Sequence, residues 1–165
     1  MRTAIAVVLA VAVLALGGWV VNGWLTLREM QAAPGAGAEA MATARSVAPD
    51  LLSYDYRTIE QDLARARQHT TGELAKHYQE LASTLVTKAR AEKTVQTAAV
   101  AGAAVMDEKP DRVEVLLFVN LGTVKQVPGK AEPQQQVSQN RAKLVMVRQG
   151  SRWLAEGLST LLGTA

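Results

Sequence analysis

Hydrophobic and polar positions divide the chain into an apolar N-terminal segment and a longer, mixed remainder. No residue from 3 to 27 carries a formal charge, and most of residues 4–25 are Ala, Val, Leu or Ile. A helix needs about 20 predominantly apolar residues to cross the hydrocarbon core of a bilayer. The pattern therefore predicts one transmembrane helix within residues 1–27.

A cleaved signal peptide is the alternative for the same segment. Its usual apolar core of about 7–15 residues, followed by small residues, matches residues 4–16 and the two glycines after them. We favour a retained anchor because the apolar run continues past these glycines, and because Trp19 and Trp24 lie toward one end, where amphipathic rings prefer the membrane–water interface. We expect a single-pass protein of the plasma membrane with its C-terminal domain on the extracytoplasmic side.

A linker and a first helix follow the apolar segment. We assign residues 28–48 to this linker and the start of the helix. Residues 31–40 carry Pro and Gly among alanines, which is typical of a spacer, and residues 36–47 could begin a helix. Pro49 should limit this helix, because proline lacks an amide proton and crowds the preceding residue. We place the folded domain at residues 49–161 and a short tail at 162–165.

Two further helices are indicated by their starts and by their periodicity. Residues 58–61 read Thr-Ile-Glu-Gln, a capping-box pattern that predicts a short helix with an apolar face at Ile59, Leu63 and Ala66. Residues 70–73 give the start of a second helix. An apolar stripe at helical spacing then predicts an amphipathic helix that runs to about residue 90, with Leu74, Tyr78, Leu81 and Leu85 on one face.

The second half of the chain changes to a pattern typical of strands. Runs rich in β-branched and apolar residues alternate with turn-like segments, and the last two runs form a hairpin that places Trp153 on a half-buried face. We predict strands at residues 94–105, 113–121, 141–148 and 152–158. The fold class is therefore α+β: helices packed on a curved antiparallel sheet of about four strands, forming a cone with a cavity.

Composition and charge exclude several classes of function. The chain has 18 Lys and Arg against 15 Asp and Glu, and the net charge of +3 is too small to predict nucleic-acid binding. The absence of Cys excludes a thiolate nucleophile, a disulfide framework and a lipidated cysteine, and two His cannot build a three-His metal centre. The sequence has no phosphate-binding or Ser-centred catalytic motif. We expect no cofactor, no metal and no catalytic residue.

A short segment concentrates polar and aromatic groups in a chain with 4% aromatic residues: Tyr54, Asp55, Tyr56 and Arg57. An Asp beside a Tyr can act as a base or position a substrate hydroxyl, so these residues are candidates to line a cavity. The alternative, which we favour, is a structural motif in which the rings pack on the sheet and Asp55 caps a helix or pairs with Arg57.

The two histidines give weaker candidates. If His69 and His77 shared one helix they would lie about 12 Å apart, too far to share a metal ion, and His69 falls at a probable helix end. We expect both on the surface.

The final hairpin carries positive charge that could dock a partner or an anionic headgroup. Strand alternation divides the four residues between two faces, which favours an ordinary solvated strand surface. The candidates are Arg141, Lys143, Arg148 and Arg152.

Four segments together resemble the Mce-associated membrane proteins of actinobacteria. They are LLSYDYRTIEQDLARARQHTTGEL at 51–74, VEVLLFVN at 113–120, RAKLVMV at 141–147 and RWLAEGL at 152–158. The resemblance implies a soluble region like nuclear transport factor 2 and SnoaL-type domains, similar also to the periplasmic domain of VirB8 proteins. It further implies an accessory role beside Mce complexes, which import sterols or fatty acids, and it brings no catalytic residues.

The functional prediction is therefore a non-enzymatic, stabilising subunit of an Mce-type lipid import complex. Its expected partners are the substrate-binding subunits and the permease, with lipid as a further candidate. One alternative is a SnoaL-like enzyme or small-lipid binder that uses the cone cavity, with Tyr54, Asp55 and Tyr56 as candidates; polar groups in an otherwise apolar cavity would favour it, and a cavity filled by side chains would exclude it. Another is a VirB8-like scaffold of a secretion system.

Overall fold

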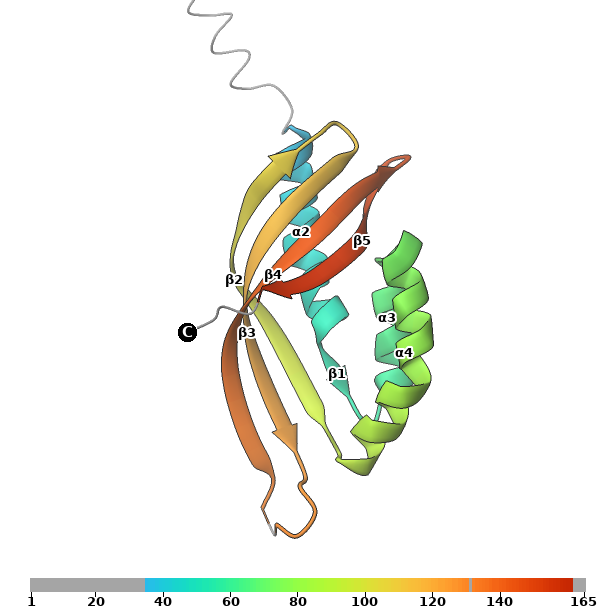
Figure 1. Ribbon diagram of the computed structural model, residues 1–165, viewed down its shortest axis with the longest axis vertical. Helices are drawn as coiled ribbons and strands as arrows, with labels where there is room; N and C mark the ends of the chain where they lie inside the picture. The colour runs from blue at the N-terminus through green and yellow to red at the C-terminus, as the bar shows by residue number, and fades with distance from the viewer. Residues whose placement is uncertain (1–34, 131, 162–165) are drawn as a thin grey trace, which may run out of the picture. The chain divides into compact units, whose positions relative to one another are not determined.

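The computed structural model describes residues 35–130 and 132–161, which form one compact unit of three helices and five strands (Figure 1). The helices come first, as predicted, with the two-residue β1 between the first two helices. The helices are α2 (Ala36–Leu52), α3 (Ile59–Gln68) and α4 (Gly72–Ala91). The strands are β1 (Tyr54–Asp55), β2 (Val95–Glu108), β3 (Arg112–Lys125), β4 (Gln134–Gln149) and β5 (Arg152–Leu161).

The strands form one antiparallel sheet in which each strand pairs with the next along the chain, in the order β1-β2-β3-β4-β5. The tight turn between β4 and β5 places Gly150 at a φ of 61°, in the left-handed region where glycine carries no steric penalty. The helix α2 lies across β2 and β3, while α3 and α4 pack together and reach the sheet at its two edges, β1 and β5.

The structure has five strands where about four were predicted, and all four predicted strands are longer than expected, β4 most of all. The extra strand, β1, pairs only with Val95 and Gln96, and two residues are too few to show an alternating pattern. Strand β4 begins at Gln134 rather than at residue 141. Its first residues are exposed glutamines together with the exposed Val137, so no buried face marked them in the sequence.

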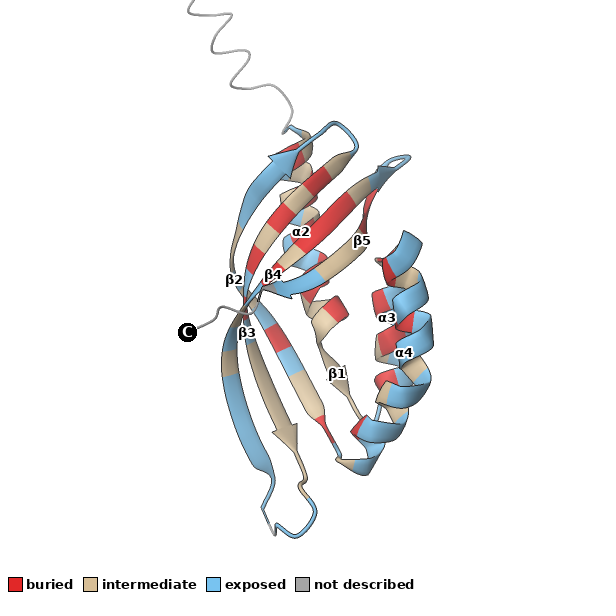
Figure 2. Ribbon diagram, in the orientation of Figure 1, coloured by how far each residue is buried: buried red, intermediate tan, exposed pale blue. Residues whose placement is uncertain are grey.

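The core lies between the sheet and the three helices. Alternate residues of β3 are buried, and they pair with buried residues of β4, for example Val115 with Leu144 and Val113 with Met146. Small residues spaced by four, Ala40, Ala44 and Ala48, face this surface of the sheet from α2 and allow the helix to approach closely. Figure 2 shows the buried residues concentrated on β3, β4 and one side of α3 and α4.

The helix α2 continues past Pro49, so the predicted limit at this residue was wrong. Proline removes one backbone donor, but Pro49 lies in the last turn, where only the bond to the carbonyl four residues earlier is lost. The carbonyl oxygen of Pro49 accepts a hydrogen bond from the amide of Ser53 at 2.9 Å. The end of the helix is therefore hydrogen-bonded, and the chain enters β1 directly.

The helix α3 begins where the sequence predicted, but the predicted capping box is not formed. Thr58 is the N-cap residue, and its hydroxyl donates to Asp62 Oδ2 at 2.9 Å instead of accepting a backbone amide. The same Asp62 oxygen accepts the backbone amide of Asp55 at 3.1 Å. Asp62 therefore ties β1 to the first turn of α3, a long-range contact that a four-residue motif cannot reveal.

Within residues 35–130 and 132–161, no helix has both the length and the apolar character needed to span a membrane. The predicted anchor with Trp19 and Trp24, residues 28–34 of the predicted linker and the C-terminal tail lie outside the described residues.

Candidate functional site

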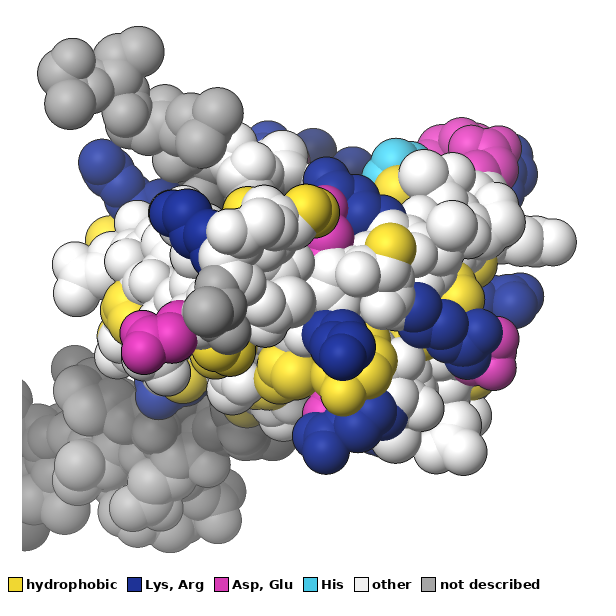
Figure 3. Space-filling model, turned by 90° about the horizontal axis from the view of Figure 1, so that it is seen from below, with side chains coloured by type: hydrophobic (Ala, Val, Ile, Leu, Met, Phe, Trp, Pro, Cys, Tyr) yellow, Lys and Arg dark blue, Asp and Glu magenta, His cyan; other side chains and the backbone are white. Residues whose placement is uncertain are grey.

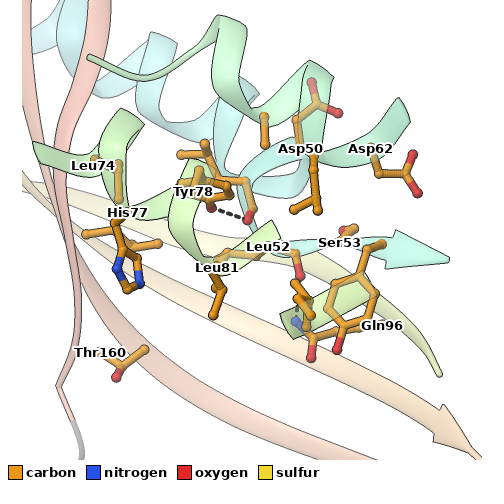
Figure 4. Close-up of a pocket in the computed structure, with 16 residues that line it drawn as sticks. Asp50, Leu52, Ser53, Asp62, Leu74, His77, Tyr78, Leu81, Gln96 and Thr160 are labelled. Atoms are coloured by element: carbon orange, nitrogen blue, oxygen red, sulfur yellow. Dashed lines mark hydrogen bonds between the residues drawn. The ribbon is translucent and has the colours of Figure 1, made fainter. Parts of the chain in front are cut away.

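A pocket of about 360 Å³ lies between the C-terminal end of α2, the helices α3 and α4, the start of β2 and the end of β5 (Figure 4). This volume falls at the low end of the range of about 300–1,000 Å³ that small-molecule sites occupy. Most of the wall is apolar: Leu51, Leu52, Leu63, Ala66, Leu74, Leu81, Leu85 and Leu158, with the rings of Tyr54 and Tyr78. Polar side chains also line it: Asp50, Ser53, Asp62, His77, Gln96 and Thr160.

The polar groups deepest in this pocket already have partners within the chain. The Tyr78 hydroxyl donates to the carbonyl oxygen of Leu51, and Gln96 Nε2 donates to that of Leu52 at 2.6 Å. The Ser53 hydroxyl oxygen accepts the amide of Ala98 at 2.9 Å. These bonds fix the segment where α2 turns into β1, and they use one hydrogen-bonding group of each of the three side chains.

Burial raises the pKa of Tyr78 to about 12. A phenol with this pKa stays protonated at neutral pH and donates its hydrogen bond permanently, so it has no capacity to act as a base there. Burial and then the negative charge of Glu92 also raise the pKa of Tyr54. Both tyrosines of the pocket are therefore neutral side chains.

The two carboxylates of the pocket are held in ion pairs. Asp50 lies 3.3 Å from His69 Nε2 and 3.6 Å from Arg65 Nη1, and Asp62 accepts Arg65 Nη2 at 3.0 Å. His69 belongs to the end of α3 and His77 to α4, so the two histidines do not share a helix. Among the described residues, no group of three or more His, Cys, Asp or Glu side chains could hold a metal ion.

The structure brings one residue of the predicted Tyr54–Arg57 cluster into the pocket, Tyr54. The Asp55 carboxylate accepts two hydrogen bonds from Arg57 Nε, at 2.9 and 3.0 Å, and a third from Arg57 Nη2. The hydrogen bonds from Arg57 lower the pKa of Asp55, and the Arg57 guanidinium lies 5.7 Å from the centre of the Tyr56 ring. The structure thus contains the Asp55–Arg57 pair that the structural interpretation predicted.

The predicted basic residues do not gather into one patch. Lys143 donates to Glu114 at 3.0 Å, and Arg148 pairs with Glu39 of α2, where its guanidinium lies 5.0 Å from the Trp153 ring. Arg141 and Arg152 are exposed, one in β4 and one at the start of β5. Figure 3, which views the molecule from below, shows Lys and Arg side chains scattered among hydrophobic and uncharged ones.

The pocket contains features that the sequence indicated only in part. The apolar stripe of α4 was visible, but half of it is not covered: Leu74 and Tyr78 are buried, Leu85 is half-buried and Leu81 is 39% exposed. Gln96 and Thr160 had no local signal, because their place in the pocket depends on how β2 and β5 lie against the helices.

Comparison with curated proteins finds mycobacterial relatives. The chain is 31% identical over 153 residues to "Uncharacterized protein Rv1362c" of Mycobacterium tuberculosis (strain ATCC 25618 / H37Rv), a match that covers 90% of this chain and 67% of that protein. It is 34% identical over 118 residues to "Outer membrane protein Rv1973" of the same strain, with 71% of each chain covered.

Comparison with solved structures identifies the fold. The structure of the Agrobacterium tumefaciens VirB8 protein is similar with a TM-score of 0.53, covering 81% of this chain and 97% of that one at 14% sequence identity. At this identity the likeness shows a VirB8-like fold alone. The family model described as "Uncharacterized protein Rv1363c/MT1408-like" matches residues 1–151. The chain therefore belongs to the Rv1363c/MT1408-like family.

Proposed function

We propose that this protein is a non-enzymatic accessory subunit of an Mce-type lipid import complex, and that it acts by protein–protein contact on the outer side of the plasma membrane. The resemblance of residues 51–74 and of the strand segments to Mce-associated proteins gives the partner class. The observation that carries the non-enzymatic part is the internal pairing of four of the six polar side chains that line the pocket. Asp50, Asp62, Ser53 and Gln96 are each bonded within the chain.

A chemical step needs a nucleophile or base that is positioned beside a vacant space and is free to move a proton. The carboxylates here pair with the Arg65 guanidinium, Asp50 also lies 3.3 Å from His69 Nε2, and the Tyr78 phenol stays protonated. Such an arrangement stabilises the domain and favours a role in holding partner surfaces. In this proposal, the N-terminal apolar segment anchors the domain at the membrane.

A VirB8-like scaffold of a secretion system is the second candidate. It is supported by the similarity in fold to the Agrobacterium tumefaciens VirB8 protein over 81% of the chain. The two candidates share an anchored extracytoplasmic domain that works by contact, and they differ in the proteins contacted. The relative named "Outer membrane protein Rv1973" is consistent with a place in the cell envelope under either candidate.

A pull-down distinguishes these candidates. The tagged full-length protein would be purified from its native membrane in a gentle detergent, and the recovered proteins would be identified by mass spectrometry. A tagged single-pass protein of unrelated sequence, purified in parallel, controls for non-specific capture. Enrichment of Mce substrate-binding subunits and permease supports the first candidate, whereas enrichment of secretion-system components supports the second. Recovery of the protein with neither set contradicts both.

A further inference from the structure

We propose that the pocket between α2, α4 and β5 binds the aliphatic chain of a free single-chain amphiphile with an acidic end, such as a fatty acid. In this proposal, the hydrocarbon chain lies against the leucines, and the acidic end lies at the rim beside His77 and Thr160. This inference goes beyond the proposed function, because it concerns the isolated chain and requires no partner protein.

The wall of the pocket has the chemistry of a hydrocarbon receptor. Seven leucines line it, contributed by α2, α3, α4 and β5. Leu81 remains 39% exposed although it continues the stripe begun by the buried Leu74 and Tyr78. Exposed apolar surface is unfavourable by about 25 cal/mol per Å², so an apolar occupant that covers Leu81 and Leu85 gains binding free energy.

The inner polar groups argue against a polar occupant. The hydroxyl of Tyr78, the amide of Gln96 and the hydroxyl oxygen of Ser53 each have a partner within the chain. A polar substituent placed among the leucines would lose its hydrogen bonds to water without adequate replacement, which typically costs about 1–3 kcal/mol. The inserted part of a ligand is therefore a hydrocarbon.

The distribution of charge orients the ligand. Figure 4 shows His77 and Thr160 together at one end of the pocket, with Gln96 and Asp62 toward the other. A carboxylate beside Asp62 and Asp50 would meet like charge, whereas His77 and Thr160 offer an imidazole and a hydroxyl as hydrogen-bond donors. His77 is exposed, so an acidic end placed there also keeps contact with water.

The size of the pocket favours a narrow occupant. A volume of about 360 Å³ is small among ligand sites, and the pocket is walled on its two sides by α4 and by the α2–β1 segment. One hydrocarbon chain suits this space better than the two chains of a membrane phospholipid.

Photoaffinity labelling of the purified full chain tests the proposal. The protein would be reconstituted in phosphatidylcholine nanodiscs and irradiated with a photoreactive lauric acid, and the labelled peptides would be mapped by mass spectrometry. We expect saturable labelling of peptides from α4 and β5 that unlabelled lauric acid displaces.

Variants of the rim and wall give the sharper comparison. Leu81→Asp places a negative charge in the apolar wall and should reduce this labelling at least about tenfold. Leu81→Met should retain it, as should Val137→Asp, which adds the same charge at a residue that is 80% exposed and does not line the pocket. His77→Glu should reduce labelling by the acid about fivefold through like-charge repulsion, but not labelling by the corresponding photoreactive alcohol.

Three results would overturn the proposal. One is the absence of saturable labelling in α4 and β5 of the unmodified chain, as expected if the pocket instead receives side chains of a partner protein. Another is equal labelling of the Leu81→Asp and Val137→Asp variants. The third is displacement of the label by added phosphatidylcholine vesicles but not by lauric acid, which would assign the pocket to a membrane phospholipid. None of these results depends on whether Mce proteins are recovered in the pull-down.

Discussion

The hydrogen bond from Tyr78 to the carbonyl of Leu51 leads to a prediction whose sign changes with pH. Tyr78 is 8% exposed, and its hydroxyl joins α4 to the end of α2 at the floor of the pocket. Tyr78→Phe removes this bond and leaves the ring in place. At neutral pH the free energy of unfolding should fall by about 1 kcal/mol, the usual net contribution of one such bond.

At alkaline pH the same substitution should be stabilising. The pKa of Tyr78 is raised from 10.0 to about 12 by burial, so its contribution to stability is fully present below pH 10 and is lost as the pH rises through the folded-state pKa. Two pKa units correspond to roughly 3 kcal/mol. Near pH 12 the unmodified protein should have lost most of this amount, while the Phe variant cannot ionise there. The variant should then be the more stable by about 1–2 kcal/mol.

Urea unfolding, monitored by far-UV circular dichroism, measures this difference in the free energy of unfolding. Unmodified and variant full chains would be compared in the same detergent at pH values from neutral to about 12, because other groups that titrate contribute equally to both proteins. Tyr56→Phe is the matched control, since Tyr56 is half-buried and packs against Arg57 away from the pocket floor; its effect should stay within about 0.5 kcal/mol. If the free energies of unfolding of Tyr78→Phe and of the unmodified chain differed by the same amount across this pH range, the reasoning would be refuted.

Three further substitutions test the packing and the local geometry by urea unfolding at neutral pH. Leu117→Ala removes a fully buried side chain of β3 and should lower the free energy of unfolding by about 2–5 kcal/mol; a loss below about 1 kcal/mol would contradict the assigned core. Gly72→Ala should lower the free energy of unfolding by about 1–3 kcal/mol, because Gly72 has a φ of 56° and an added Cβ would lie 3.2 Å from Glu156 Cγ. An unchanged urea midpoint would mean that this backbone conformation is not required. Asp62→Ala should cost about 1–3 kcal/mol, since it leaves the Asp55 amide and the Thr58 hydroxyl without their acceptor, and Glu60→Ala on the exposed face of α3 serves as its comparison.

The parts of the fold that the sequence predicted well are those where burial follows a regular period. The apolar residues of β3 alternate, with Val113, Val115 and Leu117 all facing the core. The stripe that begins at Leu74 gave the position of α4 to within one residue at its C-terminal end. In both elements one face is buried against a single neighbouring layer, so the pattern can be interpreted without knowing what that layer is.

The features that the sequence did not predict depend on contacts between distant segments. The strand β1 exists because Tyr54 and Asp55 meet the start of β2, and Asp62 anchors α3 through the backbone of Asp55. The first half of β4 pairs with the end of β3 but buries no face, so its sequence lacks an apolar period. For the pocket, the leucines of α4 were visible in the sequence, but the exposure of Leu81 was not.

The measurement that tests the central claim most directly is quantitative proteomics of the tagged full-length protein purified from its native membrane. The proposed accessory role predicts that Mce substrate-binding subunits and their permease are recovered in amounts comparable to the protein itself, and well above their recovery with the unrelated single-pass control. Recovery of the folded protein without these subunits, under detergent conditions that keep the Mce complex intact, would contradict the claim.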